Sequence, residues 1–88
     1  MPETPDQQLI VDIDLSILGA PLERFFEYER QVRQEYSWVD EAIFRSVRSR
    51  ILQEFLARPS IYSTMIFRDR LERPARENLK RSIGFLAA

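Results

Sequence analysis

The sequence contains no cysteine and no histidine. Without cysteine the chain can form no disulfide and offers no thiolate to a metal, which fits a cytoplasmic protein. Without histidine it lacks the side chain that most often serves as a general base and as a transition-metal ligand. We therefore expect no cysteine- or histidine-based catalysis by this chain alone.

Glycine and long apolar runs are also scarce. Two glycines in 88 residues argue against a turn-rich β fold. No apolar run approaches the ~18 residues that span a bilayer, and no signal peptide is recognisable. Hydrophobic residues make up 44% of the chain and charged residues 31%, so the composition is that of a folded domain. We expect one all-α domain with no membrane contact.

Charge is divided unevenly between the two halves of the chain. Residues 1–41 carry ten acids and three arginines, whereas residues 42–88 carry four acids and ten bases. Such halves can pack against each other or pair between chains. Alternatively, the arginines can form a surface for phosphate or a nucleic-acid backbone. The net charge of −1 argues against nucleic acid as the partner.

The N-terminal residues carry weak structural signals. Residues 1–8 contain two prolines and no apolar pattern, which predicts a loose leader before a single helical domain over residues 9–88. Leu9–Leu18 alternates at first like a strand. We expect an extended entry there, followed by a short helix that ends at Gly19.

Helical spacing is clear in the rest of the chain and predicts a small bundle of three to four helices. Pro21 suits the first turn of a helix that continues to about Tyr36. A second helix follows Asp40 and ends at Arg58–Pro59. Its predicted apolar stripe consists of Ile43, Val47, Ile51, Leu52, Phe55 and Leu56.

A third long helix is predicted to begin after Ser63 or Thr64, either of which can cap it. Its apolar positions are Phe67, Leu71, Leu79, Ile83 and Leu86. Its charged positions Asp69, Arg73, Glu77 and Arg81 predict a solvated face. Pro74 lies inside this pattern, so we expect a kink or a break near residues 72–73.

Asp12 and Asp14 are carboxylates within an apolar stretch. Burying a carboxylate without a partner is costly, so each must cap a helix, meet an arginine or hold a cation. Capping or an arginine partner is the favoured interpretation. A hard cation such as Mg²⁺ stays open, because it accepts oxygen ligands alone.

The same region carries a family resemblance. The run Asp12-Ile13-Asp14-Leu15-Ser16-Ile17-Leu18-Gly19, followed by Glu35-Tyr36-Ser37-Trp38-Val39, resembles the C-terminal half of the predicted metal-dependent phosphohydrolases of the HD superfamily. Further similar segments are Phe44-Arg45, Phe55-Leu56-Ala57-Arg58-Pro59 and Ala75-Arg76-Glu77-Asn78-Leu79. The resemblance covers about residues 6–86.

The resemblance implies an all-helical fold and water activation by one or two divalent metals, held by His, His-Asp and a later Asp. Asp12 or Asp14, at most one of them, would match that later Asp. The histidine positions precede the region covered here, so a divalent metal is implied by the resemblance only. We expect no cofactor in the isolated chain and no activity of it alone.

Three functional hypotheses follow. The chain can be a truncated or fragmentary relative of such a phosphohydrolase, a helical protein-interaction or oligomerisation module, or a subunit of a phosphohydrolase completed by another chain. A half-domain would expose the surface that faced its other half. We therefore expect a homo-oligomer, most simply a dimer, or another protein partner. Residues expected to need this burial are Phe25, Phe26, Ile51, Phe55, Leu79 and Ile83.

Overall fold

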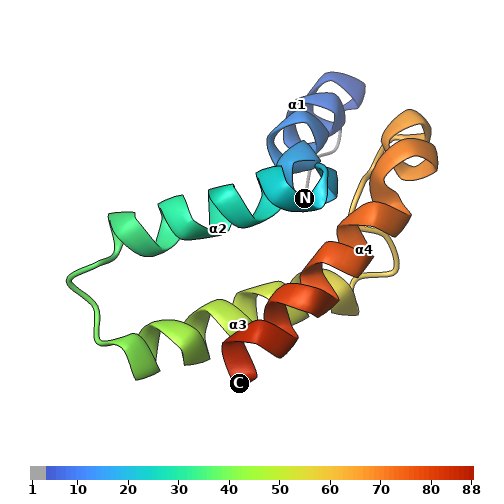
Figure 1. Cartoon of the computed structure of the whole chain (residues 1–88). Coiled ribbons are helices and arrows are strands. Elements are labelled where there is room, and N and C mark those ends of the chain that lie inside the picture. The colour runs from blue at the N-terminus through green and yellow to red at the C-terminus, as the bar shows by residue number, and fades with distance from the viewer. Residues whose placement is uncertain (1–3) are drawn as a thin grey trace.

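The computed structural model describes residues 4–88, and in this part of the chain it contains helices and no strand. The elements are α1 (Pro5–Leu15), the short 3₁₀ helix η1 (Ser16–Gly19), α2 (Leu22–Glu35), α3 (Glu41–Ala57) and α4 (Met65–Ala87) (Figure 1). The prediction of a small all-α bundle is confirmed.

The first helix begins earlier than the sequence pattern suggested. Thr4 accepts a hydrogen bond from the Gln7 backbone N–H, and the Gln7 side chain accepts one from the Thr4 backbone. Pro5 occupies the first helical position, where its missing N–H costs nothing. The predicted loose leader is therefore wrong for residues 5–8, and the predicted extended entry at Leu9 is wrong as well. Residues 1–3 of that leader lie outside the described part.

The other helix boundaries agree with the prediction. Pro21 precedes α2, and Asp40 caps α3 by accepting hydrogen bonds from the N–H groups of Ala42 and Ile43. Thr64 caps α4 by accepting from the N–H of Phe67. The charged positions of α4 that were predicted to be solvated are exposed: Asp69, Arg73, Glu77 and Arg81.

Pro74 does not break α4, which is helical from Met65 to Ala87. Of the predicted kink or break, the break is wrong, because the buried neighbours Ala75, Asn78 and Leu79 hold this part of the helix against the rest of the molecule. Tertiary packing of this kind can outweigh the ~3 kcal/mol that proline costs in a helix interior.

The helices form an elongated rather than a round molecule, measuring 39 × 22 × 21 Å. Its radius of gyration is 13.5 Å, against roughly 12 Å for a compact chain of this length. The helix α4 packs closely on η1 and α3, whereas α2 meets α4 sparsely and its backbone hardly approaches α3. Figure 1 shows α2 and α3 lying apart from each other, joined by a loop at the end of the molecule that is far from α1.

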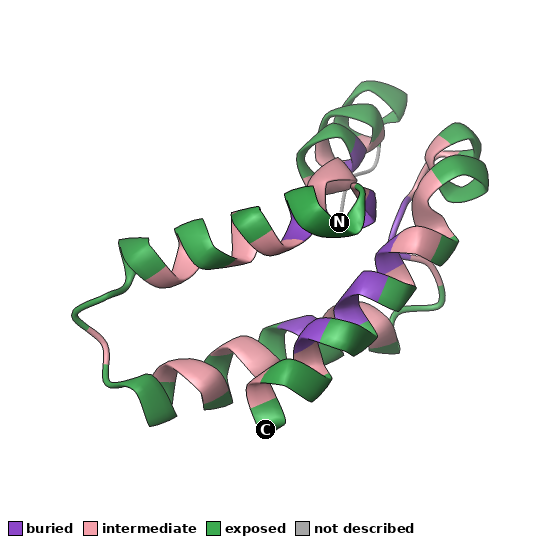
Figure 2. Cartoon of the chain, viewed as in Figure 1, coloured by how far each residue is buried: buried purple, intermediate pink, exposed green. Residues whose placement is uncertain are grey.

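Burial follows this arrangement. Buried positions lie where η1, the start of α2 and the middle of α4 meet, and the far ends of α2 and α3 carry none (Figure 2). The core consists of Leu18, Phe25, Leu52, Ile61, Tyr62, Ala75 and Leu79. No helix in residues 4–88 is both long enough and apolar enough to cross a membrane.

Several apolar side chains predicted to be buried are exposed. The stripe predicted for α3 divides: Leu52 is buried, whereas Ile43, Val47 and Ile51 face outward. Of the six residues expected to need burial, Phe25 and Leu79 are fully buried, and Phe26, Phe55 and Ile83 are packed against the core. Most of these six side chains are thus at least partly buried within one chain.

Candidate functional site

Asp12 is fully buried, and both oxygens of its carboxylate accept hydrogen bonds. Oδ1 accepts from the Ser63 N–H at 2.9 Å. Oδ2 accepts from the Thr64 N–H and the Thr64 hydroxyl, each at 2.7 Å. The side chain therefore joins α1 to the segment that enters α4, more than fifty residues later in the chain. The sequence favoured a helix cap or an arginine partner; instead Asp12 accepts from the two residues that precede α4, whose N-cap is Thr64.

The electrostatics of Asp12 agree with this role. Burial opposes ionisation and acts to raise its pKa. The hydrogen bonds from Ser63 and Thr64 and the positive charge of Arg68 outweigh burial, so the pKa of Asp12 lies below its ordinary value. Arg68 is itself held by donating to the Ser63 carbonyl at 2.6 Å. The buried carboxylate is ionised and compensated.

Asp14, the alternative metal-ligand candidate, is exposed. It lies two residues from Asp12 on the same helix, and their side chains point to different sides, one inward and one to solvent. Within residues 4–88 no group of three or more aspartates or glutamates is placed to hold a metal ion. A cation at Asp12 would have to displace the hydrogen bonds that hold the entry to α4.

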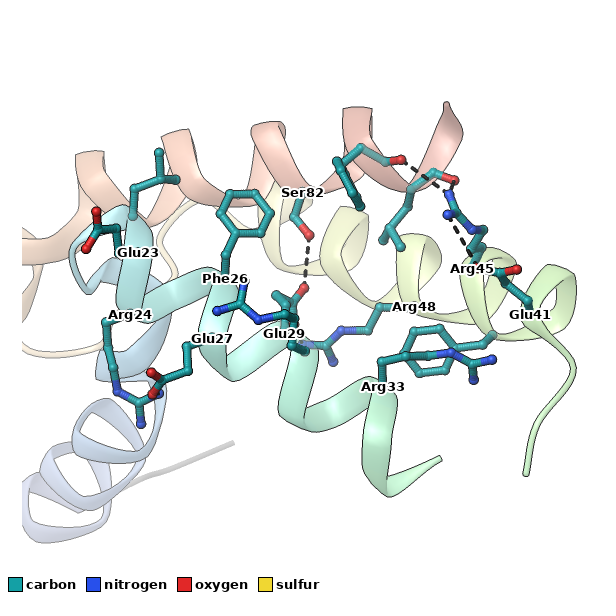
Figure 3. A pocket seen from close by; sticks show the side chains of 15 residues that line it. Glu23, Arg24, Phe26, Glu27, Glu29, Arg33, Glu41, Arg45, Arg48 and Ser82 are labelled. Atoms are coloured by element: carbon teal, nitrogen blue, oxygen red, sulfur yellow. Dashed lines mark hydrogen bonds and ion pairs between the residues drawn. The ribbon is translucent and has the colours of Figure 1, made fainter. Parts of the chain in front are cut away.

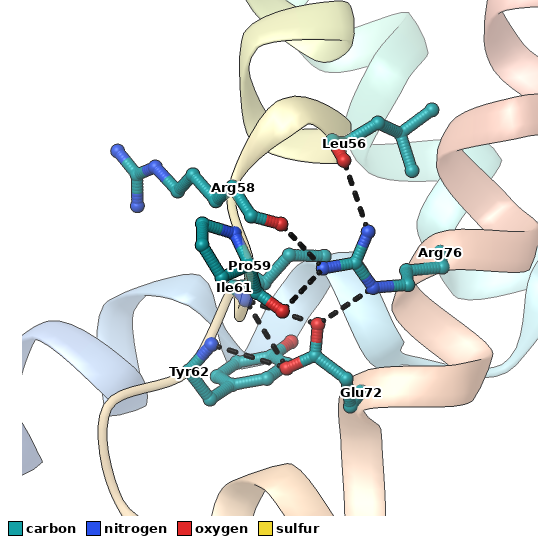
Figure 4. A network of polar contacts seen from close by, with 7 residues as sticks. All are labelled: Leu56, Arg58, Pro59, Ile61, Tyr62, Glu72 and Arg76. Atoms are coloured by element: carbon teal, nitrogen blue, oxygen red, sulfur yellow. Dashed lines mark hydrogen bonds and ion pairs between the residues drawn. The ribbon is translucent and has the colours of Figure 1, made fainter.

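A second, partly buried network surrounds Glu72, and its role was not predicted from the sequence. Glu72 accepts hydrogen bonds from the N–H groups of Ile61 and Tyr62 at 3.0–3.3 Å and pairs with Arg76 at 2.8 Å. The Arg76 guanidinium also donates to the carbonyls of Leu56, Arg58 and Pro59 at 2.8–3.3 Å (Figure 4). One i,i+4 pair on α4 thus holds the end of α3 and the connector after it.

Two further side chains tie α4 and the connector to η1. The Tyr62 hydroxyl donates to the Leu15 carbonyl at 2.8 Å, and burial together with the charges of Glu72 and Asp12 raises its pKa. The Asn78 amide donates to the carbonyls of Leu18 and Ala20 at 2.9 and 2.8 Å. These contacts stabilise the backbone and occupy the Tyr62 hydroxyl and the Asn78 amide nitrogen.

A groove of about 1000 Å³ lies between α2, α3 and the end of α4, and we call it the α2–α3 groove. Its apolar lining consists of Leu22, Phe26, Phe44, Phe85 and Leu86. Its charged and polar lining consists of Glu23, Arg24, Glu27, Glu29, Arg30, Arg33, Glu41, Arg45, Arg48 and Ser82. The groove combines an apolar surface with many guanidinium groups and is large enough for a ligand or a helix.

One polar bridge crosses the α2–α3 groove. Glu29 on α2 pairs with Arg48 on α3 and accepts a hydrogen bond from the Ser82 hydroxyl on α4 at 3.0 Å (Figure 3). The side chains of Glu29 and Arg48 are only 11% and 14% exposed. The buried Nε of Arg48 has no hydrogen-bond partner, so the bridge is less completely satisfied than the networks at Asp12 and Glu72.

Most other charges of the groove are also occupied. Arg24 pairs with Glu27 and Arg45 with Glu41. Arg33 donates to the carbonyls of Tyr36 and Val39 and lies over the Phe44 ring, 4.7 Å from its centre. Arg30, at the exposed rim, makes no hydrogen bond or ion pair with the described residues.

The comparisons with known proteins return no relative. No family model matches the chain, no curated protein matches it, and no solved structure matches its fold. The residues and their geometry therefore carry the functional conclusions.

Proposed function

We propose that this chain acts as a non-catalytic helical interaction module whose first partner is another copy of itself. The observation that carries the proposal is its surface. The accessible area is 6315 Å², whereas a compact monomer of 10.5 kDa has roughly 5,400 Å². The excess, roughly 900 Å², is close to the ~800 Å² that each partner buries in a standard interface.

The exposed apolar side chains support the same proposal. Large hydrophobic residues are exposed on α1 and α3 and in the loop between α2 and α3, where Trp38 is 79% exposed and lies beside Tyr36. Tryptophan and tyrosine are enriched among residues that dominate binding energy at interfaces. On α3, the exposed residues Ile43, Val47 and Ile51 are four positions apart and so share one face, an apolar stripe of the kind found at association sites.

The internal polar groups support the proposal that this module is non-catalytic. Asp12, Glu72 and Arg76 are committed to backbone hydrogen bonds, and Glu29 and Arg48 to each other. A general acid or base needs access to a substrate proton and a pKa near the working pH. The lowered pKa of buried Asp12 and the raised pKa of Tyr62 move both groups away from neutrality.

The resemblance to HD-superfamily phosphohydrolases supplies the ancestry within this proposal: a truncated relative that keeps the helical half and lacks the histidine ligands. The all-α fold and the burial of Asp12 are compatible with that ancestry. The rival in which a second chain supplies the histidines predicts metal-dependent turnover only in the complex.

The test combines hydrodynamics with an activity assay. Sedimentation velocity from low micromolar to several hundred micromolar protein should show a concentration-dependent dimer, and a generic phosphate ester with Mn²⁺ should not be hydrolysed. A monomer throughout this range would contradict the self-association. Turnover that is lost in Asp12→Ala or Asp14→Ala would contradict the non-catalytic assignment.

A further inference from the structure

The helix α1 has two different faces. Gln8, Val11, Asp12 and Leu15 lie on one side and are at least partly buried against the rest of the chain. Leu9, Ile10 and Ile13 lie on the opposite side and are 42%, 60% and 53% exposed. This outer face has the i, i+3 and i, i+4 spacing of helices that bind in apolar grooves.

The charge of α1 is of one sign. It carries Asp6, Asp12 and Asp14 and no basic residue. Asp6 and Asp14 are exposed, near the two ends of the outer apolar face. The α2–α3 groove has an apolar lining and five arginines against four glutamates, and its rim holds Arg30 without an ion pair to the described residues. The two surfaces are complementary in both hydrophobicity and charge.

The dimensions also agree. An 11-residue helix is about 16 Å long. On α2 the groove extends from Leu22 to Arg33, a span of the same length on a helix of the same pitch. The occupant of this groove therefore has the size of one short helix.

We infer that the α2–α3 groove binds α1 of a second copy of this chain, with the outer face of α1 on the apolar lining and its aspartates toward Arg30. Because every copy carries both surfaces, reciprocal binding closes a two-fold dimer. This inference rests on the proposed self-association and specifies its interface.

The outer stripe of α3, formed by Ile43, Val47 and Ile51, is the competing interface. It lies on a single helix, outside the set of residues that line the groove. A dimer through this stripe would place Val47 near its own symmetry mate. That geometry gives the experiment a matched control.

The absence of cysteine makes a cross-linking test direct, since any introduced thiol is unique. Three single variants are needed: Ile13→Cys on α1, Arg30→Cys on the groove rim and Val47→Cys on α3. All three positions are exposed, so folding should be retained, as circular dichroism checks. A mixture of the Ile13→Cys and Arg30→Cys proteins, treated with a short bis-maleimide, should give mainly a dimer cross-linked between positions 13 and 30. Its yield should be several-fold above that of the dimer cross-linked through position 47 in the Val47→Cys protein.

Sedimentation of charge variants provides the second readout. Ile10→Glu and Arg30→Glu should each raise the dimer dissociation constant at least tenfold, whereas Val47→Glu should change it less than threefold. A wild-type dimer that is dissociated by Val47→Glu and cross-links mainly through Val47→Cys would overturn the inference and leave the proposed function intact. A wild-type monomer would overturn both.

Discussion

The two ends of this molecule are held together in different ways. At the end formed by α1, η1 and the start of α4, which we call the closed end, buried side chains bind backbone groups directly: Asp12 to Ser63 and Thr64, and Asn78 to Leu18 and Ala20. At the open end, the α2–α3 groove, α2 and α3 meet through long side chains: Glu29 pairs with Arg48, and Arg33 lies over the Phe44 ring.

Because of this difference, one end of the molecule stabilises the fold and the other leaves its surface accessible for binding. Hydrogen bonds from backbone groups to a buried charge fix the position of two segments and are costly to break. A pair of long side chains across a groove restrains the position of the two helices less and leaves the apolar lining accessible. We expect the closed end to determine the free energy of unfolding and the open end to determine binding.

The largest expected effect is at Asp12. Asp12→Ala leaves the partly buried N–H groups of Ser63 and Thr64 without their acceptor, so the free energy of unfolding should fall by about 3 kcal/mol. The matched control is Asp14→Ala, an exposed position on the same helix, which should change it by less than about 0.5 kcal/mol. Urea titrations of both variants measure the difference. Equal effects would show that the closed end does not depend on this carboxylate.

The same side chain should make stability depend on acid pH. The pKa of Asp12 is lower in the folded protein than the ordinary value of 3.8. Its contribution is therefore fully present above about pH 5 and is lost as the pH falls below 3.8 toward the folded pKa. Unfolding free energy measured between pH 6 and pH 3 should fall more steeply for wild type than for Asp12→Asn. If the two proteins give parallel curves of unfolding free energy against pH, this pH dependence does not come from Asp12.

Close packing at the closed end should appear at Gly19. A Cβ atom placed there would lie 2.9 Å from the Leu71 Cβ and 3.1 Å from the Leu71 carbonyl oxygen. Gly19→Ala therefore requires α4 and η1 to separate slightly and should destabilise by about 1–3 kcal/mol. Thermal melts would detect this, and an unchanged melting temperature would show that the contact between η1 and Leu71 is loose.

At the open end, Glu29→Gln removes one charge of the groove bridge and leaves Arg48 partly buried without its counter-ion. We expect a loss of about 1–2 kcal/mol, because the side chains keep some access to water. Hydrogen exchange should accelerate in residues 28–35 of α2 and remain slow in the buried part of α4. Uniform acceleration throughout the chain would show that the two ends unfold as one unit.

The smallest effect is expected at Gly84, near the open end. No atom lies within 4 Å of a Cβ placed there, and the residue is inside α4. Gly84→Ala should stabilise the protein by about 0.5–1 kcal/mol through helix propensity. Urea titration beside Gly19→Ala compares the two glycines, and opposite signs are the expected result.

The sequence predicted those parts of the fold that local signals determine. Helical periodicity and the caps at Asp40 and Thr64 placed the last three helices, and the cost of burying a carboxylate predicted that Asp12 needs a partner, though not that Ser63 and Thr64 supply it. The start of the first helix was missed, because its capping box with Thr4 lies in a proline-rich segment that lacks an apolar pattern, whereas the predicted helical end at Gly19 is confirmed.

What could not be predicted depends on contacts between distant residues. Glu72 and Arg76 formed an ordinary i,i+4 pair in the sequence, and nothing local showed that the connector would lie against them. Likewise, the division of the apolar stripe of α3 depends on where α4 packs. The α2–α3 groove follows from the divergence of two helices and leaves no motif in the sequence.

The bond between Asp12 and Thr64 joins residues that are 52 positions apart. Until α1 arrives, the start of α4 lacks the acceptor that orders its entrance, even though α4 itself can form from local interactions. Since loop closure over long separations slows folding relative to purely local helix packing, this small helical protein should fold more slowly than bundles of similar size. In a growing chain, α1 is synthesised before the segment at Thr64 that it binds, so this contact can form only after that segment has been made.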